Sequence, residues 1–226
     1  MQEFLILLKL GKRDHLEALR QEGLLYMNPL AYFSKLELDA ARADRLEGTT
    51  RIIQPKHVGE FKFSHPILGE HRVPPGDLAG PVLISLNRIA SCNIYCMFAI
   101  TKPIDGEILD ARNLEFGDSF VLILNTQEFI NRMNKAAKIS HLAGERKLVE
   151  YYDPEEYSGD TGPFRKSSAF AHQNEFRLIL RPGSDEAIKF KIGSLVDITS
   201  PVLPLSEINR ILNFTTESAR EAGLLV

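Results

Sequence analysis

The feature that most constrains this 226-residue chain is the stretch Lys166–Leu180 (KSSAFAHQNEFRLIL), where polar and charged residues run directly into an apolar segment. Alternate residues of an extended chain share a face. Gln173, Glu175 and Arg177 are therefore predicted to point to one side of a strand, and the intervening apolar residues to the other. A carboxylate on a core strand is costly to desolvate unless a partner or a ligand compensates it. The rest of the chain must bring such partners to this strand.

Apolar runs and alternating patterns predict strands in many other segments. These segments are Glu3–Leu10, Leu24–Met27, Arg51–Gln54, Glu60–His65, Pro81–Asn87, Ile89–Thr101, Gly117–Asn125, Glu145–Tyr152, Ala187–Ile192 and Leu195–Thr199. The Pro- and Gly-rich pieces Pro66–Gly69 and Val73–Pro81 are predicted to be loops.

Three or four helices are expected between these strands. They are a helix capped by Asp14 and ended by Gly23, a short helix through Ala31–Ser34 with Asn28 and Pro29 at its start, a helix Gln127–Ser140 capped by Thr126, and a C-terminal helix Leu205–Asn213. The mixed order of strands and helices predicts a single α+β domain over residues 1–226. Its sheet should be mixed but mostly antiparallel, either continuous or split into two packed sheets.

The composition is that of a globular protein, with 44% hydrophobic residues, 25% charged residues and a formal net charge of -3. This near-neutral balance gives no overall excess of positive charge for binding polyanions. The chain shows no signal-peptide pattern and no stretch of membrane-spanning length, and its two cysteines suit a reducing compartment. We therefore expect a cytoplasmic protein with no membrane partner.

Common cofactor and metal motifs are missing from the sequence. It contains neither G-x-x-x-x-G-K-[ST] nor G-x-G-x-x-G, and its six histidines show no H-E-x-x-H spacing. Cys92 and Cys96 have no second cysteine pair, so they do not form a zinc-finger pattern. No metal cofactor is predicted.

Glu175 is the first candidate for chemistry. It can be a catalytic or ligand-holding carboxylate, steadied by Gln173. It can equally be the acidic half of a structural ion pair with Arg177 or Lys166, and structural ion pairs outnumber catalytic ones. The sequence leaves both interpretations open.

The second candidate is the acidic group Asp44–Gly48 (DRLEG). Asp44 and Glu47 are three residues apart and share a face if this segment is helical. They would then suit a metal ion, a cationic substrate group or a pair of ribose hydroxyls. The alternative is a solvated acidic loop.

The third candidate is the group of aromatic residues Tyr26, Tyr32 and Phe33 around Asn28. Such rings can stack on a planar ligand, with Asn28 bonding to an amide of that ligand. The more usual fate of such residues is core packing with the phenol oxygens at the surface.

The order of elements resembles that of ADP-ribosyltransferase-like folds. The resemblance is carried by the segment Gly23–Phe33 (GLLYMNPLAYF) and by Gln173-x-Glu175, which is similar to the Q-x-E motif of some of those enzymes. The chain also resembles a broad group of uncharacterised bacterial and phage proteins through Tyr26–Phe33, Asp44–Glu47 and Lys166–Arg177.

This resemblance implies NAD as co-substrate and cleavage of its nicotinamide–ribose bond. Glu175 would stabilise the developing positive charge, and Gln173 would position the acceptor, an unidentified protein or nucleic acid. Tyr26 or Tyr32 would stack on the nicotinamide, and Asn28 would bond to its carboxamide.

The resemblance also implies a residue that holds the dinucleotide from the first strand, where the family usually has Arg or His. Lys9 stands on that strand here, and Arg13 or His15 in the following turn are substitutes.

Three functions remain as hypotheses. The first is an ADP-ribosyltransferase-like enzyme that acts as a toxin or phage-conflict effector. The second is a non-catalytic interaction protein in which Glu175 and Arg177 form a structural network. The third is a metal-dependent nuclease or hydrolase that uses Asp44, Glu47 and Glu175. The sequence leaves the oligomeric state open.

Overall fold

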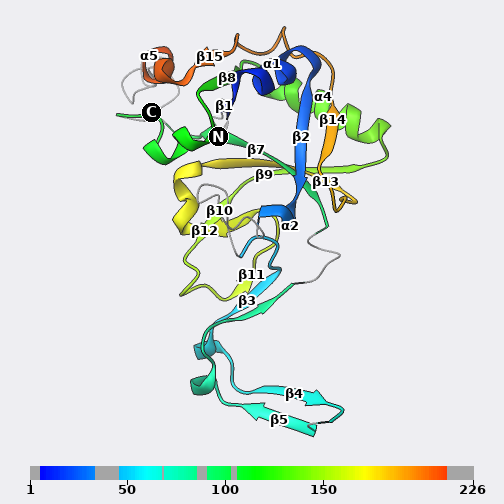
Figure 1. Cartoon of the computed structure of the whole chain (residues 1–226), viewed down its shortest axis with the longest axis vertical. Helices are drawn as coiled ribbons and strands as arrows, with labels where there is room; N and C mark the ends of the chain where they lie inside the picture. The colour runs from blue at the N-terminus through cyan, green and yellow to red at the C-terminus, as the bar shows by residue number, and fades with distance from the viewer. Residues whose placement is uncertain (1–5, 34–45, 68, 86–90, 103–105, 213–226) are drawn as a thin grey trace.

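The chain folds around one eight-stranded sheet, from which a narrow arm of smaller sheets projects (Figure 1). The structure is a computed structural model that describes residues 6–33, 46–67, 69–85, 91–102 and 106–212. The fold is α+β with mostly antiparallel strands, as the sequence predicted.

The main sheet forks at its central strand. Its strands are β1 (Ile6–Gly11), β2 (Leu24–Pro29), β7 (Asn93–Ile100), β8 (Ser119–Ile123), β9 (Ala143–Leu148), β13 (Glu175–Arg181), β14 (Ile188–Lys191) and β15 (Leu203–Pro204). Strand β13 pairs along the length of β7, and β9 follows β13 at the outer edge. The other edge of β7 is shared: β1 pairs with Phe98–Ile100, whereas β2 pairs with Asn93 and Ile94. The β1 branch continues through β8 to β15, and the β2 branch continues to β14.

Helices α1 (Arg13–Glu22) and α4 (Thr126–Ile139) cover one face of this sheet. Their apolar residues recur at helical spacing and pack on the strands through one large cluster. The helix residues of that cluster are Leu16, Leu19, Phe129, Ile130, Met133 and Ala137. The connection from α1 into β2 depends on Gly23, which adopts the left-handed conformation (φ 62°) and whose N–H reaches the carbonyl of Leu19 at 2.9 Å.

The other face of the sheet carries two smaller hydrophobic clusters. One packs strand residues such as Leu8, Phe98 and Phe120 against η5 (Leu205–Glu207) and α5 (Ile208–Ile211). The other joins Ile94 and Ile179 to α2 (Leu30–Phe33). The area of this sheet face between the two clusters is occupied by charged side chains. They form the candidate site described below.

The arm is built from segments that are far apart in the sequence. Next to the body lie the parallel pair β10 (Glu150–Tyr152) and β12 (Arg165–Ser167), with η3 (Ala111–Phe116) and η4 (Ser168–Gln173) nearby. The arm continues through the sheet of β3 (Arg51–Ile53), β6 (Val82–Ile84) and β11 (Gly159–Asp160), and through η1 (Pro55–His57) and η2 (Pro75–Asp77). It ends in the two-stranded ribbon of β4 (Phe61–His65) and β5 (Gly69–Val73) (Figure 1).

Several predicted helix starts are wrong by a few residues. Lys12, not Asp14, occupies the N-cap of α1, and it makes no side-chain capping bond. Asn125, not Thr126, caps α4, because its side chain accepts a hydrogen bond from the N–H of Glu128 at 2.9 Å. Asn28 and Pro29 were expected to start a helix. They belong instead to β2, because they pair with β7.

Three strand assignments also differ. Leu195–Thr199 was predicted to be a closing strand, but within it only Thr199 makes a ladder contact, a single bridge to Ile123. Conversely, Gly69–Val73 forms a strand that the sequence did not indicate, because its residues are mostly polar and only pairing with β4 holds it extended. The predicted strand Glu145–Tyr152 is divided between β9 and β10, which belong to different sheets.

Candidate functional site

The candidate site is a network of buried charges at the start of β13. Glu175 receives one cation on each carboxylate oxygen: Nζ of Lys166 donates to Oε1 at 2.8 Å, and Nε of Arg177 donates to Oε2 at 2.8 Å. Its side chain is 6% exposed. Both partners that the sequence offered as alternatives are therefore bound at once.

Arg177 extends the network into the arm. Its two terminal nitrogens donate to the two carboxylate oxygens of Glu47, each at 2.8 Å, in a bidentate pair. One of them also donates to the carbonyl of Pro163 at 2.6 Å. Glu47 precedes β3 and Pro163 follows β11, so one guanidinium on the body binds two segments of the arm that are far apart in the sequence.

Gln173 reaches the network by a different route from the one predicted. It ends η4 instead of lying on the strand, and Asn174 then turns the chain with a positive φ of 38°. The predicted alternation through Gln173 is therefore wrong. Its side chain still joins the site, because Nζ of Lys166 donates to Oε1 of Gln173 at 2.7 Å.

Neighbouring groups complete the surroundings of Glu175. The hydroxyl of Tyr151 accepts the backbone N–H of Glu175 at 2.9 Å. Lys166 lies 4.6 Å from the centre of the Phe170 ring, an additional cation–π contact. Cys96 lies directly opposite Arg177 on β7, and burial raises the pKa of its thiol to about 12.

The charges of the network set the ionisation of its carboxylates. Burial alone raises the pKa of Glu175, but the charges of Arg177 and Lys166 and their hydrogen bonds outweigh it, so its pKa lies well below the ordinary value. Glu47 contacts one cation and shares it with Glu175. Burial therefore prevails over the charge of Arg177 and raises the pKa of Glu47.

The residues predicted to bind the nicotinamide lie on the same sheet face as Glu175 but do not contact it. Asn28 is opposite Ile94 on β7, whereas Glu175 is opposite Phe98. Four residues of strand separate them, which is about 13 Å along β7. Tyr26 lies further out, opposite Lys189 and 55% exposed.

Tyr32 belongs to α2. It is 42% exposed and makes an edge-to-face contact with Phe33, with ring centres 5.4 Å apart. Both Tyr26 and Tyr32 therefore present ring surface to solvent, and their predicted stacking role stays a prediction.

Of the three residues predicted to hold the dinucleotide, Lys9 and Arg13 make contacts away from Glu175. Lys9 follows the face of Leu7, which is the helix-covered side of the sheet. Its Nζ donates to the carbonyl of Cys96 at 2.6 Å and lies 4.5 Å from the ring centre of Tyr95. Arg13 starts α1 and reaches the carbonyl of Val202 at 3.5 Å.

The carboxylates of the predicted metal site are brought together only in part. Glu47 and Glu175 meet around the guanidinium of Arg177, while Asp44 lies outside the described residues. Within the described ranges, no group of three or more His, Cys, Asp or Glu side chains is placed to hold a metal ion. In the same part of the chain, no helix has the length and apolar character needed to cross a membrane.

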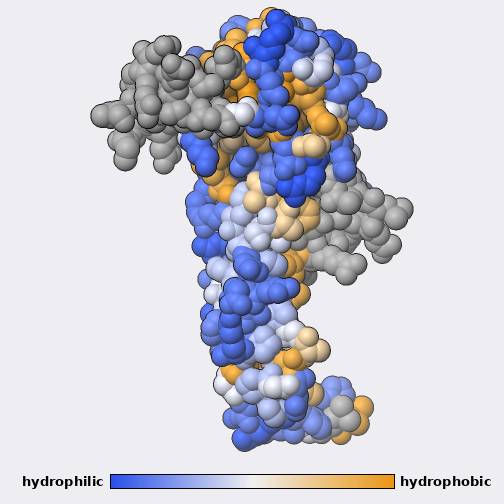
Figure 2. Space-filling view, turned by 90° about the vertical axis from the view of Figure 1, so that its left-hand side faces the viewer, coloured by the Kyte–Doolittle hydropathy of each residue, from blue (hydrophilic) through white to orange (hydrophobic). Residues whose placement is uncertain are grey.

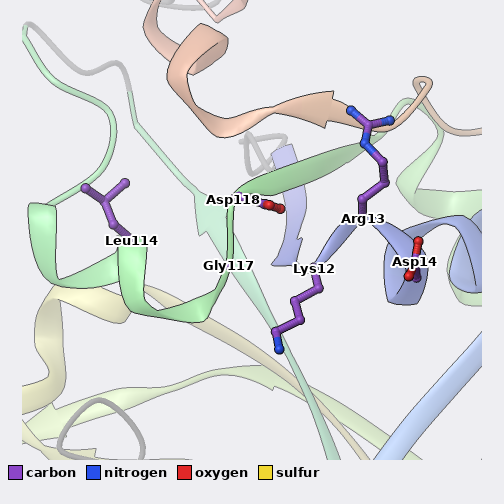
Figure 3. A pocket seen from close by; sticks show the side chains of 6 residues that line it. All are labelled: Lys12, Arg13, Asp14, Leu114, Gly117 and Asp118. Carbon is purple, nitrogen blue, oxygen red and sulfur yellow. The ribbon is translucent and has the colours of Figure 1, made fainter.

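A shallow pocket of about 480 Å³ lies at the start of α1 (Figure 3). Its lining is Lys12, Arg13, Asp14, Leu114, Gly117 and Asp118. The lining combines two basic and two acidic side chains, so its electrostatic character is mixed. None of the network residues contributes to it.

Sequence reasoning identified Lys166, Gln173, Glu175 and Arg177 but not the role of Glu47, which it assigned to a metal or a ligand. Glu47 and Arg177 are 130 residues apart, and no local pattern links them. No protein-family model, curated protein or solved structure matches this chain.

Proposed function

We propose that this protein is a non-catalytic interaction protein, in which the network of Lys166, Glu175, Arg177 and Glu47 fixes the arm on the body. The observation that supports this most directly is the position of Arg177. It is 1% exposed and binds Glu175 on its own strand, Glu47 before β3 and Pro163 after β11. A side chain in this position sets the direction of the arm.

The state of Glu175 favours a structural role over a catalytic one. A nucleophile or general base needs a carboxylate oxygen that can reach the reacting atom. Both oxygens of Glu175 are engaged by cations, and the low pKa holds the group ionised. A substrate would have to displace Lys166 or Arg177 from a buried contact, at a cost typical of breaking a buried ion pair, about 3–5 kcal/mol.

Hydrogen exchange in the variant Arg177→Met tests this role in the full-length protein. We expect the backbone amides of β3 and β11 to exchange faster than in the wild type, because Glu47 and Pro163 lose their common donor. The matched control is Arg181→Met, on the same strand, whose Nε pairs with the half-exposed Glu145 at 3.1 Å. Unchanged protection of β3 and β11 in Arg177→Met, beside an unchanged control, would refute the proposal.

The second candidate is the ADP-ribosyltransferase-like enzyme implied by the resemblance. The observation that favours it is that Glu175, Asn28 and the exposed Tyr26 share one face of the main sheet. It predicts NAD consumption by the wild type and none by Glu175→Ala. It also predicts an NAD-dependent rise in melting temperature that is lost in Tyr26→Ala. Turnover that depends on Glu175 would replace the first proposal with this one.

A further inference from the structure

The ribbon at the end of the arm has one aromatic face. In the register of β4 and β5, Phe61 lies opposite Val73 and Phe63 lies opposite His71. Because paired and alternate residues share a side of the ribbon, these four side chains and His65, at the end of β4, form one surface. The rings of Phe63 and His71 stack with centres 5.2 Å apart and planes 20° apart, and the Phe61 ring centre lies 6.4 Å from that of Phe63. We call these five residues, His65 included, the aromatic ribbon face.

This face is exposed in spite of its stacking. Phe61 is 37% exposed and Phe63 is 42% exposed, and Ile67 in the adjoining turn is 86% exposed. Figure 2 shows apolar side chains at the surface of the outer end of the arm, among hydrophilic ones. A two-stranded ribbon is marginally stable in water without further strands or a covered face. The ribbon therefore exposes an apolar surface of the kind that a binding partner covers.

The charges of the ribbon indicate which partner fits. Its opposite face carries Lys62 facing Arg72, and Glu60 binds both, at 3.0 and 3.3 Å. Glu70 is the second acidic residue of the segment Glu60–Val73, which thus holds two acidic and two basic residues and no net charge. Binding to a nucleic acid draws on a basic surface, which this segment lacks. A face that bears only apolar and aromatic groups and two imidazoles is complementary to another copy of itself.

We propose that the aromatic ribbon face binds the same face of a second copy of this chain, ribbon against ribbon, about a two-fold axis. The inference rests on the proposed interaction function and names its partner. Two ribbons stacked about 10 Å apart enclose a shared layer of Phe and His rings. Lys62, Glu70 and Arg72 stay on the outer faces, so the contact buries none of these charges.

The arm makes this contact accessible. It carries the ribbon away from the body (Figure 1), so two ribbons can meet while the bodies remain apart. Strands of five residues are about 17 Å long, and two such ribbons bury less than the roughly 800 Å² per partner of a standard interface. The expected dimer is therefore weak.

Sedimentation velocity from about 1 to 300 µM tests the association. The average mass of the wild type should rise from the 25.4 kDa of one chain toward twice that value. Phe63→Lys places a charge on the aromatic ribbon face and should remain monomeric over the whole range. Ser64→Lys is the matched control, because it adds the same charge at the next residue, on the opposite face and facing Glu70. It should associate like the wild type.

Fluorescence locates the contact. The chain has no tryptophan, so Phe61→Trp provides a single reporter on the aromatic ribbon face. Its emission should move to shorter wavelengths as the concentration rises, because the ring leaves water. Ser64→Trp, on the opposite face, should show no such shift.

Three results would overturn the inference. These are a wild type that stays monomeric at every concentration, a Phe63→Lys variant that associates as the wild type does, and a Phe61→Trp dimer whose emission does not shift. Micromolar binding of a single-stranded oligonucleotide, lost in Phe63→Lys, would assign the face to nucleic acid and also overturn it. These measurements of association are independent of NAD turnover and of hydrogen exchange in β3 and β11 of Arg177→Met. A failure of the proposed dimer can therefore be distinguished from a failure of the proposed function.

Discussion

Glu175→Gln is the substitution that most directly measures what the buried network contributes. It keeps the shape of the side chain but removes its charge. One amide oxygen replaces two carboxylate oxygens, so either Lys166 or Arg177 loses its acceptor while remaining buried, at 4% and 1% exposure. Lys166 keeps Gln173, and Arg177 keeps Glu47 and Pro163, so the loss is partial.

The expected cost lies at the lower end of the range for breaking a buried ion pair, about 3 kcal/mol. For a chain of this length, each kcal/mol lowers the melting temperature by about 2–4 °C. Calorimetry and far-UV circular dichroism should therefore show a decrease of about 6–12 °C, with a matching decrease of the midpoint in urea. The slope of the urea transition should not change, because the substitution exposes no new surface in the native state.

Glu150→Gln is the matched control. Glu150 also pairs with two cations, Lys147 at 2.5 Å and Arg165 at 2.9 Å, but its side chain is 46% exposed. Exposed ion pairs contribute less than about 1 kcal/mol, so this variant should melt within about 2–4 °C of the wild type. If Glu175→Gln melts as the control does, the network does not hold the fold, and a functional role for Glu175 becomes the better explanation.

Three further predictions concern ionisation. Because the pKa of Glu175 in the folded chain lies below its ordinary value of 4.5, its ionised form stabilises the native state above that pH. The stabilisation is lost as the pH falls below about 4.5, so the difference in melting temperature between wild type and Glu175→Gln should shrink from pH 6 to about pH 3; a constant difference would contradict this. Burial and the charge of Arg112 lower the pKa of His172, so the wild type should lose stability as the pH falls through 6.5. In His172→Leu, thermal melts should show a smaller loss between about pH 7 and pH 5. Burial raises the pKa of Cys92 to about 11 and that of Cys96 to about 12, so at about pH 8 an aromatic disulfide reagent should titrate both thiols only after denaturation. Rapid reaction of the native protein would contradict it.

Local patterns in the sequence were sufficient for the elements that build the body. The apolar run around β7 and β8 predicted buried strands, and the helical spacing of Phe129, Ile130 and Met133 predicted α4. Gly23 marked the end of α1, because a left-handed residue is needed there. These signals are periodicities and conformational preferences of neighbouring residues. They do not depend on where the segment lies in the fold.

The remaining differences arise where pairing overrides local preference. Asn28 and Pro29 have the chemistry of a helix start, but pairing with β7 makes them part of β2. The polar segment Gly69–Val73 has no strand pattern, and β4 alone makes it a strand.

The sequence by itself determined that a carboxylate enters a core strand at Glu175 and requires compensation. It placed Lys166 and Arg177 close enough along the chain to be candidates. Only the tertiary structure decided that both bind at once, that Arg177 reaches Glu47 across 130 residues, and that the network joins the arm to the body. The physical reason is that desolvation cost is a property of one residue in its strand, whereas the partners that offset it are supplied by whichever distant segments the chain folds against that strand.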